Sequence, residues 1–190
     1  MIQAVIFDCF GVLATDGWLP FRDAHFGDKP DLLEQARFNN VLVDQGQMSY
    51  HDFMLWLAEV TGVPFDEIRR VIEGNVPNEP LFSYIRDSLA PRYQIGLLSN
   101  AGANWLDTLF EPWQVALFDE AVLSYQLGIV KPNPAIYEAT ATRLGVLPEE
   151  AIFIDDRIEF VTGAKAVGMH GVHYKSVDQT TTELEALLRA

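Results

Sequence analysis

Side chains suited to phosphoryl transfer follow or flank short apolar runs at four separate places in the sequence. They are Asp8, Ser99, Asn100, Lys131, Asp155 and Asp156. An aspartate carboxylate can attack phosphorus and form an aspartyl-phosphate, which water then hydrolyses. Because a bare carboxylate repels a phosphate dianion, such a site also needs cations close to the reacting oxygens.

Mg²⁺ and a lysine would supply those cations. Asp8, Asp155 and Asp156 offer the hard carboxylate oxygens that Mg²⁺ prefers, and the same ion binds substrate phosphate. Lys131 would neutralise the transferring oxygens, while Ser99 and backbone N–H groups would donate hydrogen bonds to them. Each signal is weak when taken singly, because a lone aspartate after a strand more often caps a turn or a helix. The prediction therefore rests on the order of the whole set along the chain and on its placement at strand ends.

A parallel sheet would bring these side chains together. The sequence predicts strands, apolar on both faces, at 3–7, 94–98, 151–154 and 171–174. Helices are predicted at 80–89, 104–110, 134–144, 159–167 and 179–188. This alternation predicts an α/β protein with a Rossmann-like parallel sheet, in which ligands bind beyond the carboxyl ends of the strands.

Residues 15–78 interrupt the alternation and contain no convincing strand. Helical patterns occur there at 31–42, 49–61 and 65–74, and Ser49 is the predicted N-cap of the second. We expect a helical insertion after the first strand. The predicted organisation is a core domain of residues 1–14 and 79–190 with an inserted helical unit of residues 15–78.

The composition favours a globular protein that does not bind nucleic acid. Its 13 Lys and Arg residues against 27 Asp and Glu residues give a net charge of −14, which leaves few cations for a basic binding face. The apolar stretches are strand-sized and interrupted, so no membrane-spanning helix is expected. Cys9 is the only cysteine, and the first residues lack the positive charges of a signal peptide. We therefore expect a cytoplasmic protein without internal disulfides.

The four segments resemble the motifs of the haloacid dehalogenase superfamily. VIFDCFGVL resembles its first motif, IGLLSN its second, GIVKPNPAIYE its third and EEAIFIDDRIEFVTGAKAVGM its fourth. The insertion lies where this family places a helical cap after the first strand. Within it, DQGQMSYHDF (44–53) is similar to a cap stretch of bacterial sugar-phosphate phosphatases and of the N-terminal phosphatase domain of soluble epoxide hydrolases.

The resemblance implies a Mg²⁺-dependent phosphatase acting on a small phosphorylated metabolite, as a monomer or a homodimer. Asp8 would be the nucleophile and a metal ligand, and Phe10 would lend Mg²⁺ its backbone carbonyl. Asp156, supported by Asp155, would complete the metal site, although either carboxylate could be the direct ligand. The residues implied to bind phosphate are Ser99, Asn100 and Lys131, of which Lys131 would also be catalytic.

Phe10 departs from the pattern of the family's phosphatases, which carry a second aspartate there as general acid and base. Such proton transfer contributes about 10²–10⁴-fold to the rate, and a phenylalanine side chain cannot supply it. The phosphatase would then favour substrates with good leaving groups, or use a proton donor from the cap or from the substrate. The metal needs only a backbone carbonyl at this position, so its site can survive.

Two other functions agree with parts of the pattern. A metal-independent 2-haloacid dehalogenase needs no proton for halide release, and those relatives have an aromatic residue two places after the nucleophile and a tyrosine that resembles Tyr137. They have uncharged residues at the positions of Asp155 and Asp156, which without Mg²⁺ would repel a carboxylate substrate. A catalytically inactive binding module is the third possibility, and the retained Asp8 and Lys131 argue against it.

Overall fold

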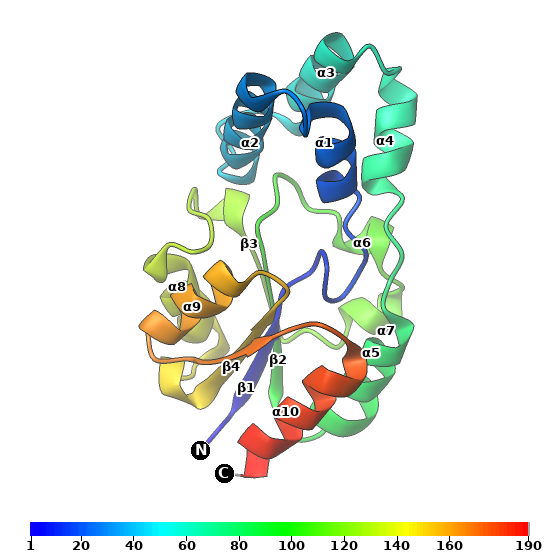
Figure 1. The fold of residues 1–190 in the computed structure, drawn as a ribbon. Coiled ribbons are helices and arrows are strands. Elements are labelled where there is room, and N and C mark those ends of the chain that lie inside the picture. The colour runs from blue at the N-terminus through cyan, green and yellow to red at the C-terminus, as the bar shows by residue number, and fades with distance from the viewer. Residues whose placement is uncertain (190) are drawn as a thin grey trace.

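A computed structural model, which describes residues 1–189, has a five-stranded parallel sheet between two layers of helices (Figure 1). The strand order is β3-β2-β1-β4-β5. The strands are β1 (Ala4–Phe7), β2 (Gln94–Ser99), β3 (Glu120–Leu123), β4 (Ala151–Asp155) and β5 (His170–His173). The predicted α/β class with a parallel sheet is confirmed, and all four predicted strands lie near their predicted bounds.

The strand β3 was not predicted from the sequence. It has four residues, EAVL, of which Glu120 and Ala121 are only half-buried. An edge strand pairs on one side only, so it does not need the continuous apolar run that identifies a central strand.

The central strand β1 is completely buried and faces a different core on each side. Val5 and Phe7 pack into one apolar cluster, and Ala4 and Ile6 pack into the other. Since successive side chains of a strand point to opposite faces, an uninterrupted apolar strand requires helices on both faces.

The two helical layers come from different parts of the chain, and Figure 1 shows them on opposite sides of the sheet. One face packs against α5 (Glu79–Tyr84), a π-helical turn (Ile85–Leu89), α6 (Leu106–Leu109), α7 (Pro112–Val115) and α10 (Val177–Arg189). The other face packs against α8 (Pro134–Leu144) and α9 (Ile158–Ala166). Two short 3₁₀ turns, Ser124–Gln126 and Pro148–Glu150, complete the core.

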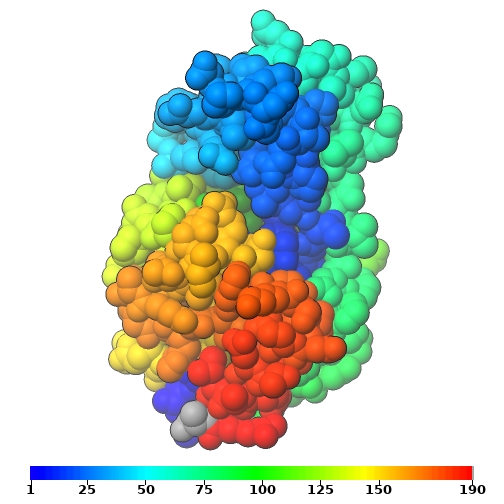
Figure 2. Space-filling model, viewed as in Figure 1, coloured from blue at the N-terminus to red at the C-terminus, as the bar shows by residue number. Residues whose placement is uncertain are grey.

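A separate group of helices lies beyond the carboxyl ends of the strands (Figures 1 and 2). It consists of α1 (Trp18–Phe26), α2 (Pro30–Asp44), α3 (Tyr50–Thr61) and α4 (Phe65–Glu73). These helices enclose their own apolar cluster, in which Phe26, Leu57 and Ile68 are fully buried. Ser49 caps α3 as predicted, since its hydroxyl accepts a hydrogen bond from the Asp52 N–H at 3.0 Å.

Two neighbouring chain segments connect this helical group to the sheet. The Thr15 N–H donates to the Val76 carbonyl at 3.0 Å, and the Asn78 N–H donates to the Leu13 carbonyl at 2.8 Å. We propose that residues 15–78 form a cap on the core of residues 1–14 and 79–190. Within residues 1–189, no helix has the length and apolar character needed to cross a membrane.

Candidate active site

Three of the predicted side chains stand at the carboxyl ends of neighbouring strands. Asp8 follows β1, Ser99 ends β2 and Asp155 ends β4, and β1 pairs with β2 on one side and with β4 on the other. The sequence order of the strands reverses at β1, and open α/β sheets bind their ligands at such a switch point.

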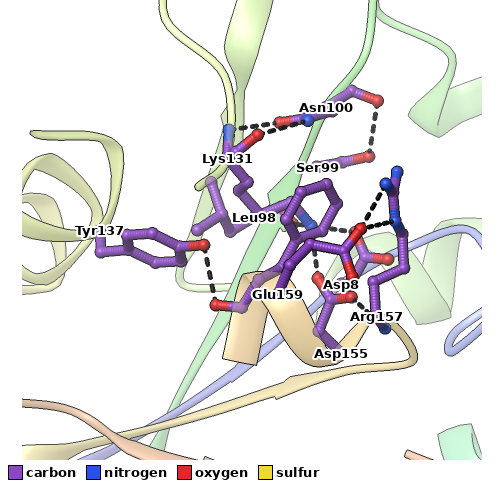
Figure 3. Close-up of polar contacts among 10 residues, drawn as sticks. Asp8, Leu98, Ser99, Asn100, Lys131, Tyr137, Asp155, Arg157 and Glu159 are labelled. Carbon is purple, nitrogen blue, oxygen red and sulfur yellow. Dashed lines mark hydrogen bonds and ion pairs between the residues drawn. The ribbon is translucent and has the colours of Figure 1, made fainter. Parts of the chain in front are cut away.

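The Lys131 ammonium lies between two of these carboxylates (Figure 3). Its Nζ donates to Asp8 Oδ1 at 2.6 Å and to Asp155 Oδ2 at 2.7 Å, and a third contact reaches the Leu98 carbonyl at 3.3 Å. The Lys131 and Asp155 side chains are almost completely buried, and 9% of the Asp8 side chain is exposed. A lysine buried to this degree requires paired charges, and the two carboxylates provide them.

Backbone contacts fix the position of Lys131. The Asn100 carboxamide accepts a hydrogen bond from the Lys131 N–H at 2.8 Å and donates one to the Lys131 carbonyl at 3.3 Å. The ammonium also lies 4.9 Å from the centre of the Phe160 ring, within the range of a cation–π contact. Asn100 thus positions Lys131, while its predicted role in binding phosphate stays a prediction.

The two adjacent acids differ in their hydrogen bonding. Asp155 has both oxygens engaged, one with Lys131 and the other with the backbone N–H of Arg157 at 2.8 Å. Asp156 Oδ1, by contrast, is buried and has no hydrogen-bond partner within residues 1–189. A buried carboxylate oxygen without a partner is costly, which favours Asp156 over Asp155 as a direct ligand of a cation.

The site carries more negative than positive charge. Asp8, Asp155 and Asp156 are three carboxylates, and in the described part of the chain Lys131 is the side-chain cation that pairs with the first two. Burial, reinforced by the charge of Asp155, raises the pKa of Asp8 to about 8 and that of Asp156 to about 6. Burial would lower the pKa of Lys131, but Asp155 and Asp8 outweigh it and raise that pKa.

A divalent cation would balance this excess of negative charge. One oxygen from each of Asp8, Asp155 and Asp156 lies within 4.8 Å of the other two. Carboxylate oxygens at this spacing, one of them lacking any other partner, fit a hard ion such as Mg²⁺. The side chains at this site therefore suit the predicted Mg²⁺.

The turn after Asp8 brings the backbone close to Asp156. Gly11 has φ +92°, which side-chain-bearing residues rarely adopt, and a Cβ built there would lie 2.5 Å from Asp156 Oδ2. Glycine at this position is therefore needed both for the turn and for the placement of the Asp156 carboxylate.

We expect Gly11→Ala to weaken Mg²⁺ binding and to destabilise the fold by about 1–3 kcal/mol, because it adds backbone strain and displaces Asp156. Isothermal titration calorimetry with Mg²⁺ and urea unfolding measure the two effects. Gly62→Ala is the matched control, because Gly62 has φ +71° but no atom within 4 Å of its built Cβ. It should lose stability and keep its Mg²⁺ affinity. Equal Mg²⁺ affinity in the two variants would contradict the expectation.

Phe10 packs its side chain against a residue that sequence reasoning did not identify. The rings of Phe10 and Trp105 have centroids 4.8 Å apart, and Trp105 belongs to the loop that follows β2. The predicted use of the Phe10 backbone carbonyl by Mg²⁺ stays a prediction. No local pattern links the two aromatic residues, because 95 positions separate them in the sequence (105 − 10).

Two other residues have clear structural partners. Ser99 is buried, and its hydroxyl lies 3.4 Å from the Asn100 carbonyl, so its predicted contact with phosphate stays a prediction. Tyr137 is also buried, and its hydroxyl donates to the Phe160 carbonyl at 2.9 Å (Figure 3). Tyr137 therefore acts in packing between α8 and α9.

The sheet and the site define a Rossmann-like α/β protein with an acidic, lysine-containing site at the carboxyl ends of its strands. A sequence model of the haloacid dehalogenase-like hydrolases matches residues 2–168. The chain belongs to this family and is a hydrolase.

One relative that this chain matches over almost its whole length is a phosphatase. A sesquiterpene phosphatase of Aspergillus oryzae is 28% identical over 193 residues, which cover 98% of this chain and 96% of the relative. A predicted hydrolase of the same family from Porphyromonas gingivalis has a TM-score of 0.77 at 26% identity, covering 100% of this chain and 99% of that one. A Bacteroides thetaiotaomicron family member, in complex with magnesium and inorganic phosphate, shares the fold with a TM-score of 0.69 at 22% identity, over 93% and 96% of the two chains.

Proposed function

We propose that this hydrolase is a Mg²⁺-dependent phosphatase that cleaves a small phosphorylated metabolite through an aspartyl-phosphate on Asp8. The observation that carries the proposal is the buried cluster in which Lys131 joins Asp8 to Asp155 while Asp156 keeps an unpartnered oxygen. The phosphatase relative and the magnesium and phosphate complex of a structural neighbour support it. The cytoplasmic location and the monomeric or homodimeric state stay predictions.

The chain's own groups account for the transfer. A carboxylate oxygen of Asp8 bonds to phosphorus as the bond from phosphorus to the leaving oxygen breaks. Lys131 and Ser99 bind the oxygens of the transferring group. Water then attacks phosphorus, the bond to Asp8 breaks, and inorganic phosphate leaves. Mg²⁺, held by Asp8, Asp156 and the Phe10 carbonyl, would offset the charge of the phosphate oxygens.

The other two functions have less support. In the dehalogenase hypothesis a tyrosine resembling Tyr137 would help at the site, but the Tyr137 hydroxyl is bonded to the Phe160 carbonyl. Asp155 and Asp156 would also repel a haloacid carboxylate at a site without a divalent ion. A binding module would not need a nucleophile next to a buried lysine.

The test measures phosphate release from p-nitrophenyl phosphate with Mg²⁺ and after chelation, and chloride release from 2-chloropropionate without metal. We expect phosphate release that stops on chelation and returns when Mg²⁺ is added. Chloride release that is insensitive to the chelator would contradict the proposal in favour of a dehalogenase. The absence of both activities would favour the binding module.

A further inference from the structure

The inference that follows rests on the proposed function, in which the leaving oxygen needs a proton. An alcohol leaves phosphorus as an alkoxide unless an acid of the enzyme protonates it. In the second step, the conjugate base of that acid takes a proton from the attacking water. Phe10 has no proton to give and packs on Trp105. If the protein itself supplies the donor, the candidates are the titratable groups that surround Lys131.

Most of those groups are committed to other contacts. Asp155 uses both oxygens, on Lys131 and on the Arg157 N–H. Asp16 lies just before α1, and its Oδ1 accepts from the N–H groups of Trp18 and Leu19 at 2.7 and 3.1 Å. The Arg157 guanidinium is paired with the Glu159 carboxylate.

Asp44, the last residue of α2, comes from the cap and is fixed against the core. Its carbonyl accepts a hydrogen bond from Ser124 Oγ at 2.5 Å, and that oxygen in turn accepts from the Ala101 N–H at 2.9 Å. Ala101 follows Ser99 and Asn100, and Ser124 follows β3. The hydrogen bonds therefore tie the backbone of Asp44 to the loops that carry the phosphate-binding candidates.

Glycines allow the cap and core backbones to approach each other at this point. A Cβ on Gly102, after β2, would lie 2.1 Å from Val43 Cγ1, and one on Gly46 would lie 3.2 Å from the Tyr125 carbonyl. Residues 43–46 are therefore in direct contact with the rim of the sheet. Figure 1 shows the end of α2 above this rim.

The Asp44 carboxyl group has one hydrogen-bond partner in residues 1–189, the Asn40 side-chain amide, which donates to Oδ2 at 2.8 Å. Burial raises the pKa of Asp44 to about 7. The charges of Lys131 and Arg157 lower this pKa, and the charge of Asp16 raises it. Asp44 is half-buried where the end of α2 meets the loops that follow β2 and β3.

We propose that Asp44 is the general acid and base of the reaction. Its carboxylic acid gives a proton to the leaving oxygen as the bond from that oxygen to phosphorus breaks, so an alcohol departs. The resulting carboxylate then takes a proton from the water that cleaves the aspartyl-phosphate, which restores the acid and releases phosphate.

The test compares Asp44→Asn with Asp31→Asn, an exposed aspartate in the first turn of the same helix. Both variants are assayed with Mg²⁺ on glycerol 1-phosphate, a poor leaving group, and on p-nitrophenyl phosphate, a good one. The quantity is kcat/KM, which reports the step that expels the leaving group. We expect Asp44→Asn to lower it by about 10²–10⁴-fold for the alkyl substrate and by less than about tenfold for the aryl one. Asp31→Asn should change neither.

Two pH measurements separate proton transfer from a structural role. The kcat/KM of the wild type for the alkyl substrate should fall as the pH rises through about 7, and Asp44→Asn should lack this limb. Because a raised pKa means that ionised Asp44 destabilises the fold, Asp44→Asn should gain thermal stability relative to the wild type above pH 7 more than below it.

An equal loss for both substrates, or no loss, would overturn the role of Asp44 and leave the phosphatase proposal intact. The same holds for a wild type that cleaves only the aryl substrate, or that keeps the alkaline limb after Asp44→Asn. A wild type that releases no phosphate from either substrate would instead overturn the proposed function, and the role of Asp44 with it.

Discussion

Asp8→Asn is expected to lower phosphate release by about 10⁴–10⁶-fold, the range known from removing members of a catalytic unit. An amide cannot form the aspartyl-phosphate, and it also offers Mg²⁺ one oxygen fewer with a formal charge. The measurement is kcat for p-nitrophenyl phosphate with Mg²⁺. Asp107→Asn is the control, because Asp107 is exposed near the same rim of the sheet, in α6.

The fold should survive this change. Lys131 keeps its ion pair with Asp155 at 2.7 Å, so the ammonium is not left without a partner. We therefore expect Asp8→Asn to unfold in urea within about 1 kcal/mol of the wild type. Turnover close to that of the wild type in a folded Asp8→Asn protein would exclude Asp8 as the nucleophile.

Lys131→Met is expected to destabilise the protein by about 3–5 kcal/mol in the presence of a chelator, because it leaves the buried carboxylates of Asp8 and Asp155 without their shared cation. Urea unfolding measures this free energy. Lys175→Met serves as the control, since Lys175 is exposed and its side chain has no ion pair within residues 1–189.

Mg²⁺ should restore part of the stability lost in Lys131→Met, because a divalent ion among the same carboxylates replaces some of the missing charge. Phosphate release should fall together with stability, since Lys131 also binds the transferring oxygens in the proposed mechanism. A Lys131→Met protein as stable as Lys175→Met would show that the ion pairs contribute no net stability.

Short-range patterns in the sequence predict several features of the fold. The helix α8 has its predicted bounds, Pro134–Leu144. The Asn133 side chain accepts from the Ala135 N–H just before it, and Gly145 follows it with φ 71°. Apolar runs predicted four of the strands, and the polar residues after them predicted the rim at which Asp8 and Asp155 meet. Caps and side-chain periodicity act over a few residues, so one segment contains all the information that they need.

Contacts between distant segments depended on how the layers pack. Lys131 pairs with Asp8 across 123 positions, and Ser124 holds the Asp44 carbonyl across 80. Neither partner is marked by a local pattern, because burial and close approach arise only when cap, sheet and loops are assembled. The same reason explains why the neighbour of Phe10 and the edge strand β3 were not foreseen. The residue types thus indicated the chemistry in advance, whereas their partners, their charge balance and the position of Asp44 followed from tertiary packing.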